Sequence, residues 1–523
     1  MTYFWRGDAK HIAQDEAGIK ACLTAVDQPC YVLDVDGFIG FTNAGEMSTG
    51  SGTYPILAFT PPTPPSSLGS AVFRHVYGVK YAYMAGAMAN GIASADMVIA
   101  LGRAGMLASF GAAGLVPQRI EEAIAKIQGA LPNQPYAFNL IHSPSEMAIE
   151  QRAVELFLRH NITTVEASAF LEVTPTITYY RVAGLSQAPD GTIIPKNRVI
   201  AKISRKEVAE GFMSPPPANF VADLLAQGKI SPQQAEWATH IPMADDVTCE
   251  ADSGGHTDNR PLSALVPVIL ELRDQLQAQF GFATPVRVGA GGGIGTPSAV
   301  LGTYMMGAAY VVTGSVNQSC IEAGASDHTK KLLAQADMTD VMMAPAADMF
   351  EMGVKLQVLK KGTLFPLRAQ KLYDLYREYP SIEAIPADER VKIEKTVFRR
   401  NMDDVWADTV AYFEARDPEQ IHRANANPKA KMALIFRWYL GLSSRWSNTG
   451  EVGREMDYQI WCGPAMGAFN EWVRGTSLEH PQNRRVADVA EHLMLGAGIS
   501  YRLNQLRVQG VDLPSEFLTY RPK

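Results

Sequence analysis

The strongest constraint on the fold is a repeated alternation of short apolar runs with amphipathic stretches between residues 81 and 315. The apolar runs are rich in Val, Ile and Ala and do not alternate with polar residues, which is typical of strands buried on both faces of a parallel sheet. Eight such runs lie near residues 81, 107, 137, 164, 199, 247, 286 and 309. Eight consecutive β/α units predict a TIM (β/α)8 barrel, and the strand count disfavours a doubly wound α/β sheet.

The segments around this repeat predict additional parts. Residues 1–60 contain CYVLDVDGFIGFTN, in which two apolar runs flank Asp-Gly, a hairpin signal, and the Pro- and Ser-rich stretch 59–70 predicts a linker. The long connection at about 204–246 is helix-like, and we interpret it as an inserted lid or partner surface. Helical periodicity with mixed charge beyond residue 330 predicts a C-terminal helical region. The expected domains are a small N-terminal unit (1–60), the barrel (71–330) and the helical region (331–523).

Composition limits the partners and the compartment. Lys+Arg 47 against Asp+Glu 54 gives a net charge of −7, which argues against nucleic acid as a partner. Five scattered cysteines without CxxC spacing argue against a disulfide framework and against a metal site, and favour a reducing cytoplasm. The N-terminus has no apolar signal sequence, and the least charged stretch is too rich in Gly and Ala for a membrane span. We therefore expect a cytoplasmic protein without membrane contact.

Glycine-bearing turns follow the last two predicted strands: Gly291, Gly292 and Gly293 after strand seven, and Gly314 with Ser315 after strand eight. Thr296 is a natural N-cap and Pro297 a natural first residue for the helix between them. Glycines let the backbone approach an anion closely, and in barrels the loops after strands seven and eight commonly hold a phosphate. We predict a phosphate site here; the weaker alternative is that the glycines only form tight turns.

The end of strand six carries VTCEADSGGHTDNR, in which Gly254 and Gly255 precede His256. An imidazole at this position can orient a substrate carbonyl or relay a proton near neutral pH. The alternative is a structural histidine satisfied by a neighbouring backbone group.

A small, flat loop follows strand one: Gly86, Ala87 and Met88. Such a loop lets a planar ring lie against the main chain, although close helix packing explains it equally well. Asn139 and Lys202 also lie at strand ends. Their amide and ammonium groups could hydrogen-bond a ring, although each is individually more often a structural polar residue.

Together these clusters resemble the flavin-dependent barrel family of nitronate monooxygenases and FMN-dependent enoyl-ACP reductases. That family has a Gly-Gly-Met or Pro-Met loop after strand one, Glu-Ala-Gly-Gly-His after strand six, Gly-Gly-Ile after strand seven and Gly-Thr after strand eight. This chain has Gly-Ala-Met, Asp-Ser-Gly-Gly-His, Gly-Gly-Ile and Gly-Ser at these places. The departures at Asp252, Ser253 and Ser315 are mild for flavin binding but leave the choice of substrate open.

Three further segments, 140–170, 355–376 and 457–476, are similar to the PfaD family, the trans-acting enoyl reductases of polyunsaturated fatty-acid and polyketide synthases. This resemblance covers nearly the whole chain. It implies that NADPH reduces FMN, which passes a hydride to a 2-enoyl thioester on an acyl carrier protein. It further implies that the glycine loops anchor FMN, that Asn139 and Lys202 contact its ring, and that His256 supplies the proton or polarises the carbonyl.

Several alternatives stay open. A flavin oxidase of the nitronate monooxygenase type would use oxygen as its acceptor, and a non-catalytic flavin-binding subunit would only dock the synthase. A phosphosugar isomerase or aldolase on the same barrel would need Lys202 or Glu166 as its base. For the oligomeric state, a homodimer through the C-terminal helices is the default expectation.

Overall fold

The computed structural model describes residues 3–50, 52–142 and 147–522, and its centre is a closed barrel of eight parallel strands in the order β12-β13-β15-β16-β6-β7-β8-β9. The barrel strands are β6 (Tyr83–Ala85), β7 (Leu107–Phe110), β8 (Ala137–Ile141), β9 (Thr164–Ser168), β12 (Arg198–Ile203), β13 (Asp246–Glu250), β15 (Arg287–Gly291) and β16 (Val311–Thr313). Each strand lies at one of the predicted apolar runs. The predicted TIM barrel is therefore confirmed.

Helices surround the barrel, and most of them bury one apolar face against the strands. They are α2 (Ala71–Tyr77), α3 (Ala95–Arg103), α4 (Pro117–Ala130), α5 (Met147–Arg159), α6 (Pro175–Ala183), α7 (Lys206–Met213), α10 (Leu262–Phe280), α11 (Pro297–Met305) and α12 (Ser315–Gln318). At the start of α11 the Thr296 side chain accepts a hydrogen bond from the Ala299 N–H at 3.3 Å, and Pro297 is the first helical residue. The predicted N-cap and first residue of this helix are confirmed.

The N-terminal unit is a five-stranded antiparallel sheet in the order β3-β2-β5-β1-β4, with one helix against it. Its elements are β1 (Phe4–Arg6), α1 (Glu16–Thr24), β2 (Cys30–Val35), β3 (Phe38–Thr42), β4 (Glu46–Ser48) and β5 (Tyr54–Thr60). Between β2 and β3, Asp36 and Gly37 have φ angles of 53° and 87°. Two consecutive left-handed residues define the tight hairpin turn that Asp-Gly predicts.

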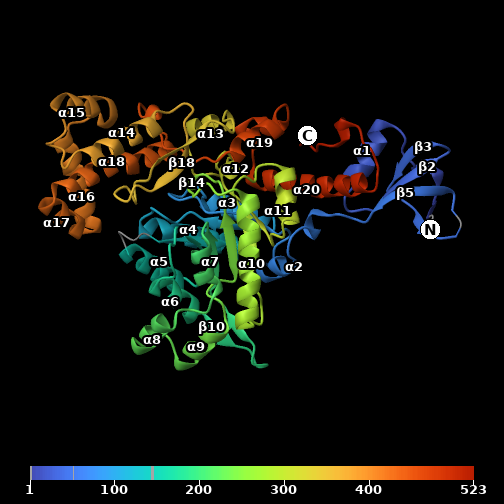
Figure 1. Cartoon of the computed structure of the whole chain (residues 1–523), viewed down its shortest axis with the longest axis horizontal. Helices are drawn as coiled ribbons and strands as arrows, with labels where there is room; N and C mark the ends of the chain where they lie inside the picture. The colour runs from blue at the N-terminus through green and yellow to red at the C-terminus, as the bar shows by residue number, and fades with distance from the viewer. Residues whose placement is uncertain (1–2, 51, 143–146, 523) are drawn as a thin grey trace.

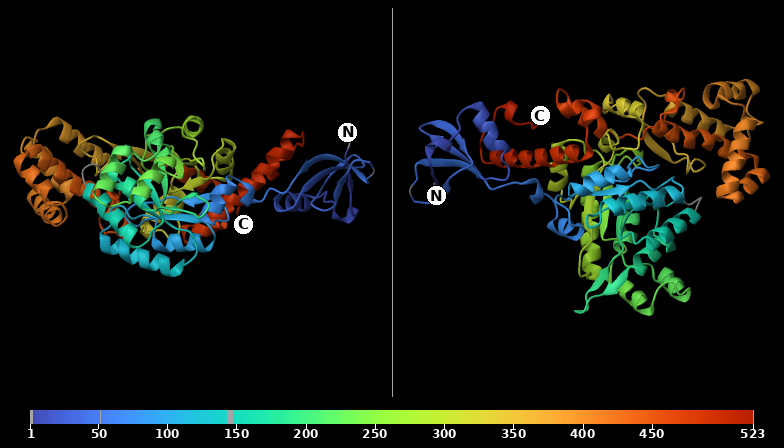
Figure 2. Two further views of the ribbon diagram at one scale, coloured as in Figure 1. Left: turned by 90° about the horizontal axis from the view of Figure 1, so that it is seen from below. Right: turned by 180° about the vertical axis from the view of Figure 1, so that it is seen from behind.

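The last long helix, α20 (Val486–Val508), joins the N-terminal sheet to the barrel (Figure 1, Figure 2). It contacts α11 and α3 at the barrel and α1 and β5 at the sheet. Arg502 of α20 is fully buried and donates hydrogen bonds to the carbonyls of Cys22 at 3.0 Å and Ala25 at 2.9 Å. Because these carbonyls end α1, the guanidinium caps the negative end of that helix and fixes the sheet to α20.

The connection predicted as an insert contains α8 (Ala218–Ala226) and α9 (Pro232–Trp237). These helices pack on α6 and on the small hairpin of β10 (Leu185–Gln187) and β11 (Ile193–Pro195). All of them lie just before β12 or β13 in the chain, at the amino-terminal end of the barrel, opposite β14 (Gly255–His256) and α12 in Figure 1. The interpretation as a lid is therefore wrong, because α7 has already returned the chain to the amino-terminal end before these helices begin: the Met243 N–H, just before β13, donates to the Ser214 carbonyl at 2.8 Å, just after α7. A role as a partner surface stays a prediction.

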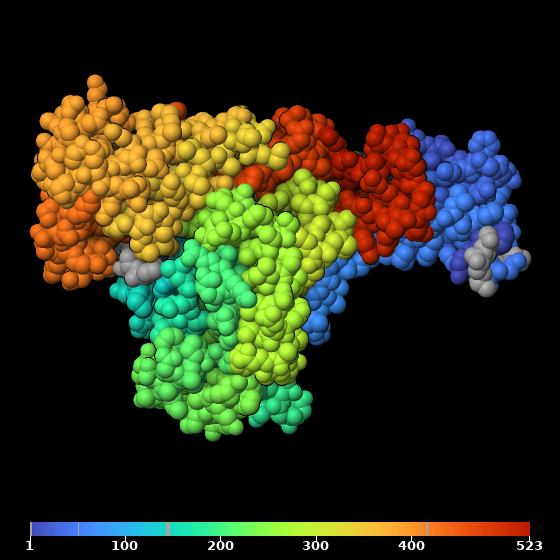
Figure 3. All heavy atoms as spheres, in the orientation of Figure 1, coloured from blue at the N-terminus to red at the C-terminus, as the bar shows by residue number. Residues whose placement is uncertain are grey.

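The C-terminal region is mainly helical, with α13 (Asp327–Ala334), α14 (Phe365–Glu378), α15 (Ala387–Ile393), α16 (Met402–Arg416), α17 (Pro418–Ala426), α18 (Pro428–Thr449) and α19 (Ala465–Val473) besides α20. It also contains β17 (Val341–Pro345) and β18 (Lys355–Leu359), which form a three-stranded sheet with β14. These two strands were not predicted from the sequence. The whole molecule has the outline of a T, with the barrel as its stem (Figure 3). Within the described residues, no helix is long and apolar enough to cross a membrane.

Candidate active site at the mouth of the barrel

The carboxyl ends of the barrel strands bring the predicted loops to one rim. The N–H of Gly86 after β6 donates to the Thr313 carbonyl at 2.9 Å, which joins the first loop to the last strand. The N–H of Ala251 after β13 donates to the Gly291 carbonyl at 2.9 Å, which joins the His256 loop to the glycine turn after β15. Residues that lie far apart in the sequence therefore share the mouth of the barrel.

The two glycine turns present backbone donors to open space. Within the described residues, the N–H groups of residues 292–296 and 314–316 donate to no partner. A Cβ atom built on Gly293 or on Gly314 would meet no atom within 4 Å. At Gly292, φ is 94° and a Cβ atom would lie 2.7 Å from the backbone of Ala251, so that position requires glycine. Free N–H groups beside open space are what a bound phosphate needs.

A third segment, residues 462–467, closes on these turns from the C-terminal region. The Gly463 N–H donates to the Ser315 hydroxyl at 3.0 Å. A Cβ atom on Gly254 would lie 2.8 Å from the backbone nitrogen of Cys462, and one on Gly295 would lie 2.2 Å from the Ala465 carbonyl. This contact gives Gly254 a packing role, while its predicted role in cofactor binding stays a prediction. This segment was not predicted to lie at the site, although its Gly-Pro pair is a turn signal.

Inside the mouth, Lys202 of β12 lies between two carboxylates. Its Nζ atom is 3.1 Å from Glu250 Oε1 and 3.9 Å from Glu166 Oε1. Burial lowers the pKa of Lys202, but the two carboxylates outweigh it, so the pKa lies above its ordinary value. Burial raises the pKa of Glu166, against the effects of Lys202 and of the Ala87 N–H, which donates to Glu166 Oε2 at 2.7 Å. Glu166 thus ties the predicted flat loop to β9.

Asn139 is almost fully buried, and its amide is already engaged. Its Nδ2 atom donates to the Glu166 carbonyl at 3.1 Å and to the Ser168 hydroxyl at 3.0 Å. Only its oxygen is left for a ligand, so the predicted ring contact reduces to an acceptor. Met88 of the flat loop is half-buried, and its carbonyl accepts the Ala93 N–H at 3.1 Å.

His256 is held by the extra sheet rather than by the barrel itself. Gly255 and His256 form β14, which pairs antiparallel with Gln357 and Leu356 of β18. The Gln357 amide also donates to Asp252 Oδ1 at 2.7 Å and to the Ser253 carbonyl at 2.8 Å. The loop that carries the imidazole is therefore pinned at both ends, and Asp252, one of the departures from the family pattern, serves as its anchor.

The imidazole of His256 contacts a carboxylate. Its Nε2 atom lies 3.1 Å from Oδ1 of Asp348, in the turn between β17 and β18. Burial lowers the pKa of His256, but the charge and the hydrogen bond of Asp348, together with the charge of Glu250, raise it above its ordinary value, against a smaller effect of Lys202. The pKa of Asp348 is lowered: burial raises it, and His256 outweighs burial. Asp348 was not predicted as a site residue, because nothing in its local sequence marks it.

Some buried side-chain oxygens at this end have no hydrogen-bond partner in the described chain, among them Glu166 Oε1, Ser253 Oγ and Asn317 Oδ1. Unpaired buried oxygens are costly unless a ligand or water completes them.

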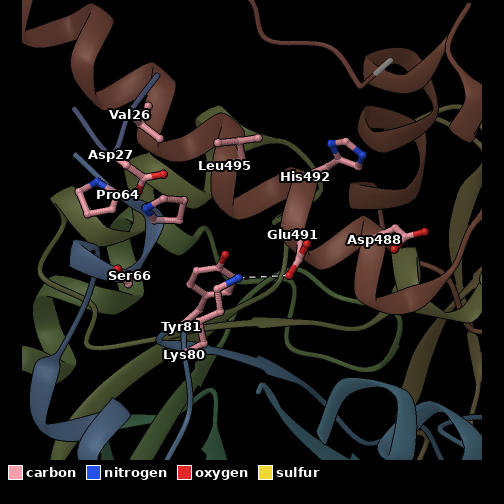
Figure 4. A pocket seen from close by; sticks show the side chains of 11 residues that line it. Val26, Asp27, Pro64, Ser66, Lys80, Tyr81, Asp488, Glu491, His492 and Leu495 are labelled. Atoms are coloured by element: carbon pink, nitrogen blue, oxygen red, sulfur yellow. Dashed lines mark hydrogen bonds and ion pairs between the residues drawn. The ribbon is translucent and has the colours of Figure 1, made fainter. Parts of the chain in front are cut away.

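A separate cavity of about 300 Å³ lies outside the barrel, between the linker and α20, beside the ion pair of Lys80 with Glu491 (Figure 4). None of its lining residues belongs to the glycine turns.

The closed barrel, with its glycine turns and a histidine at one rim, has the features that the resemblance to flavin-dependent barrel enzymes predicts. Residues 72–372 match the family model of nitronate monooxygenase, and residues 5–62 match the N-terminal domain of the fatty acid synthase subunit PfaD. Residues 379–458 match the inserted helical domain of acyl-carrier-protein S-malonyltransferase. The chain belongs to the nitronate monooxygenase family, and its N-terminal unit matches the N-terminal domain of PfaD.

Three relatives illustrate the similarity. A polyunsaturated fatty acid synthase subunit of Thraustochytrium sp. is 47% identical over 507 residues, which are 95% of this chain and 34% of that protein. Polyketide biosynthesis protein PksE of Bacillus subtilis is 46% identical over 450 residues, 86% of this chain and 58% of that protein. The solved enoyl reductase domain of MlnA, from the macrolactin biosynthesis cluster of Bacillus amyloliquefaciens, is 40% identical with a TM-score of 0.81, covering 85% of this chain and 100% of that domain. The chain thus spans less than two thirds of the length of the first two relatives.

Proposed function

We propose that the protein is an FMN-dependent enoyl reductase that serves a polyunsaturated fatty-acid or polyketide synthase, takes its electrons from NADPH, and reduces a 2-enoyl thioester on an acyl carrier protein. The observation that carries the proposal is the placement of His256 at the rim that bears the two glycine turns. The similarity to a solved enoyl reductase domain at 40% identity supports the reaction class. The synthase proteins among the relatives support the carrier-protein partner.

The residues at the mouth fit FMN. The unpartnered N–H groups of residues 292–296 and 314–316 would hold the phosphate, and the open positions at Gly293 and Gly314 leave room for it. Lys202 and the oxygen of Asn139 would contact the polar edge of the ring. When bound and reduced, FMN would supply a hydride.

The protein's own side chains then supply position and a proton. A raised pKa keeps a larger fraction of His256 protonated near neutral pH, so its imidazolium can polarise the thioester carbonyl or protonate the α-carbon of the substrate. Lys202, shared by Glu250 and Glu166, stays charged and fixed. The contributions of His256 and Lys202 both depend on holding the reacting groups in one geometry rather than on strong binding.

The test uses the purified chain loaded with FMN under anaerobic conditions. We expect NADPH to bleach the visible absorption of the flavin and a crotonyl thioester of acyl carrier protein to restore it, with formation of the butyryl thioester. Bleaching without any product from the crotonyl thioester would contradict the proposed reaction.

The family match over residues 72–372 favours a second candidate, a nitronate oxidase. In that case a nitronate would bleach the flavin, NADPH would not, and oxygen would restore the colour. The same anaerobic cuvette separates the two reactions.

A further inference from the structure

The two ring nitrogens of His256 have different surroundings. Nε2 faces Asp348 at 3.1 Å, whereas Nδ1 has no hydrogen-bond partner among the described residues. The side chains of His256 and Asp348 are 32% and 34% exposed, so both are reachable from the mouth. A carboxylate beside one ring nitrogen keeps a proton on that nitrogen and leaves the other free to react.

The backbone around Asp348 is built to keep this contact. Asp348 lies in the turn between β17 and β18, two strands that pair over five residues, from Val341–Leu359 to Pro345–Lys355. His256 itself pairs with Leu356 of β18. His256 therefore belongs to the three-stranded sheet, and Asp348 lies in the connection 346–354 that the paired ends of β17 and β18 hold next to it. The Ala346 N–H donates to the Val354 carbonyl at 2.9 Å, which closes the base of this connection.

We propose that Asp348 is the positioning residue of the site: it holds a proton on Nε2 of His256, so that Nδ1 is the atom that exchanges its proton with the substrate. In the proposed reaction the Nδ1–H bond breaks and a C–H bond forms at the α-carbon. The imidazolium becomes a neutral imidazole that is still protonated on Nε2, and Asp348 stays ionised throughout. This consequence rests on the proposed enoyl reduction, whereas the pairing itself does not.

Three charged groups act on the imidazole. Asp348 lies in the turn between β17 and β18, Glu250 on β13, and Lys202 on β12; the two carboxylates favour the imidazolium and the ammonium disfavours it. Because the carboxylates prevail, removing Asp348 lowers the pKa of His256. The protonated fraction at a given pH then falls, and the decline of activity with rising pH begins at a lower pH.

The first measurement is an NMR titration of the imidazole in protein labelled with ¹³C-histidine. The signal of His256 among the ten histidines is identified by its loss in His256→Gln. We expect Asp348→Asn to lower the midpoint of this titration and Asp348→Glu to restore part of the shift. Glu351→Gln is the matched control, because it removes a charge from the same turn while Glu351 contacts Arg437 at 3.3 Å instead of the imidazole.

The second measurement is the pH profile of kcat/KM with the crotonyl thioester. We expect the alkaline limb of Asp348→Asn to move to lower pH in step with the titration, with kcat reduced about 10-fold at pH 8 and KM little changed. An unchanged midpoint in Asp348→Asn, with the far-ultraviolet circular dichroism of the wild type, would overturn the positioning role even if turnover persists. A shifted midpoint in a protein that reduces no enoyl thioester would support the pairing and overturn the proposed function alone.

Discussion

At the amino-terminal end of the barrel, Asp246 of β13 receives two hydrogen bonds from Arg287, at 2.7 and 2.6 Å, and one from Tyr77 at 2.6 Å. At the carboxyl end, Lys202 is shared by two carboxylates, and Oε1 of Glu166, 3.9 Å from the Lys202 ammonium, accepts no hydrogen bond in the described chain. Both sets of charges are largely buried, but only in the first does every oxygen of the fully buried carboxylate accept a hydrogen bond. Burial still raises the pKa of Asp246, with Arg287 opposing it.

The difference indicates which end serves which purpose. A buried charge that is fully paired stabilises one conformation, since removing either partner leaves the other stranded in a medium of low polarity. Incomplete pairing at the mouth leaves acceptors and donors available to a ligand, at some expense in stability. In barrels of this kind, one end carries the fold and the other carries the chemistry.

The largest effect on stability is expected from removing the buried ion pair at the amino-terminal end of the barrel. Arg287→Met leaves the buried Asp246 carboxylate without its cation and with only the Tyr77 hydrogen bond, and should lower the free energy of unfolding by about 3–5 kcal/mol. Urea unfolding followed by tryptophan fluorescence measures this. Lys126→Gln, which breaks an exposed ion pair with Asp96, is the control and should cost less than about 1 kcal/mol. Equal losses of unfolding free energy in the two variants would show that the buried pair contributes no more to stability than an exposed one.

The next effect concerns the mouth. His256→Gln should reduce the turnover of the crotonyl thioester about 100- to 1,000-fold, which is about 3–4 kcal/mol in the barrier, because the proton donor is lost. The free energy of unfolding should change by less than about 0.5 kcal/mol, since the side chain is one-third exposed. If His256→Gln unfolded as readily as Arg287→Met, the proposed division between the two ends would be wrong.

A smaller pair of effects compares a bonded hydroxyl with an unbonded one. Inside the barrel, Thr248 Oγ1 lies 2.7 Å from the Tyr310 hydroxyl, whereas Ser253 Oγ at the mouth has no partner in the described chain. Thr248→Val should cost about 1–2 kcal/mol in the free energy of unfolding, because it strands the buried Tyr310 hydroxyl. Ser253→Ala should change it by less than about 0.5 kcal/mol in the flavin-free protein. Chemical denaturation of both variants side by side checks the ordering, and a larger loss in Ser253→Ala would reverse it.

Local sequence was enough to predict the barrel and the rim. Each β/α unit is short, so the apolar run, the N-cap at Thr296 and the glycines at 291–293 lie within one stretch of chain. The hairpin at Asp36-Gly37 was predicted for the same reason. A one-dimensional pattern suffices where the structure it describes is local.

The missed parts of the site depend on distant partners. Asp348 is 92 positions from His256, and Gly463 is 148 positions from Ser315. Strand β18 pairs with β14 and β17, and neither its composition nor the sequence beside it predicts this pairing. The lid interpretation failed similarly, since it depended on which end of the barrel the segment 204–246 reaches. Register and packing decide such contacts.

The claim on which the account depends is that the glycine turns at the mouth bind the phosphate end of FMN. The most direct test is a titration of FMN into flavin-free protein, followed by its visible absorption, in the wild type, Gly314→Ala and Gly129→Ala. Gly129 in α4 is the matched control, because a Cβ atom there also meets nothing within 4 Å. We expect saturable binding in the wild type and in Gly129→Ala, and binding weakened about 10-fold or more in Gly314→Ala, whose methyl group would occupy the phosphate position. Absence of binding in the wild type, or equal affinity in all three proteins, would contradict the account.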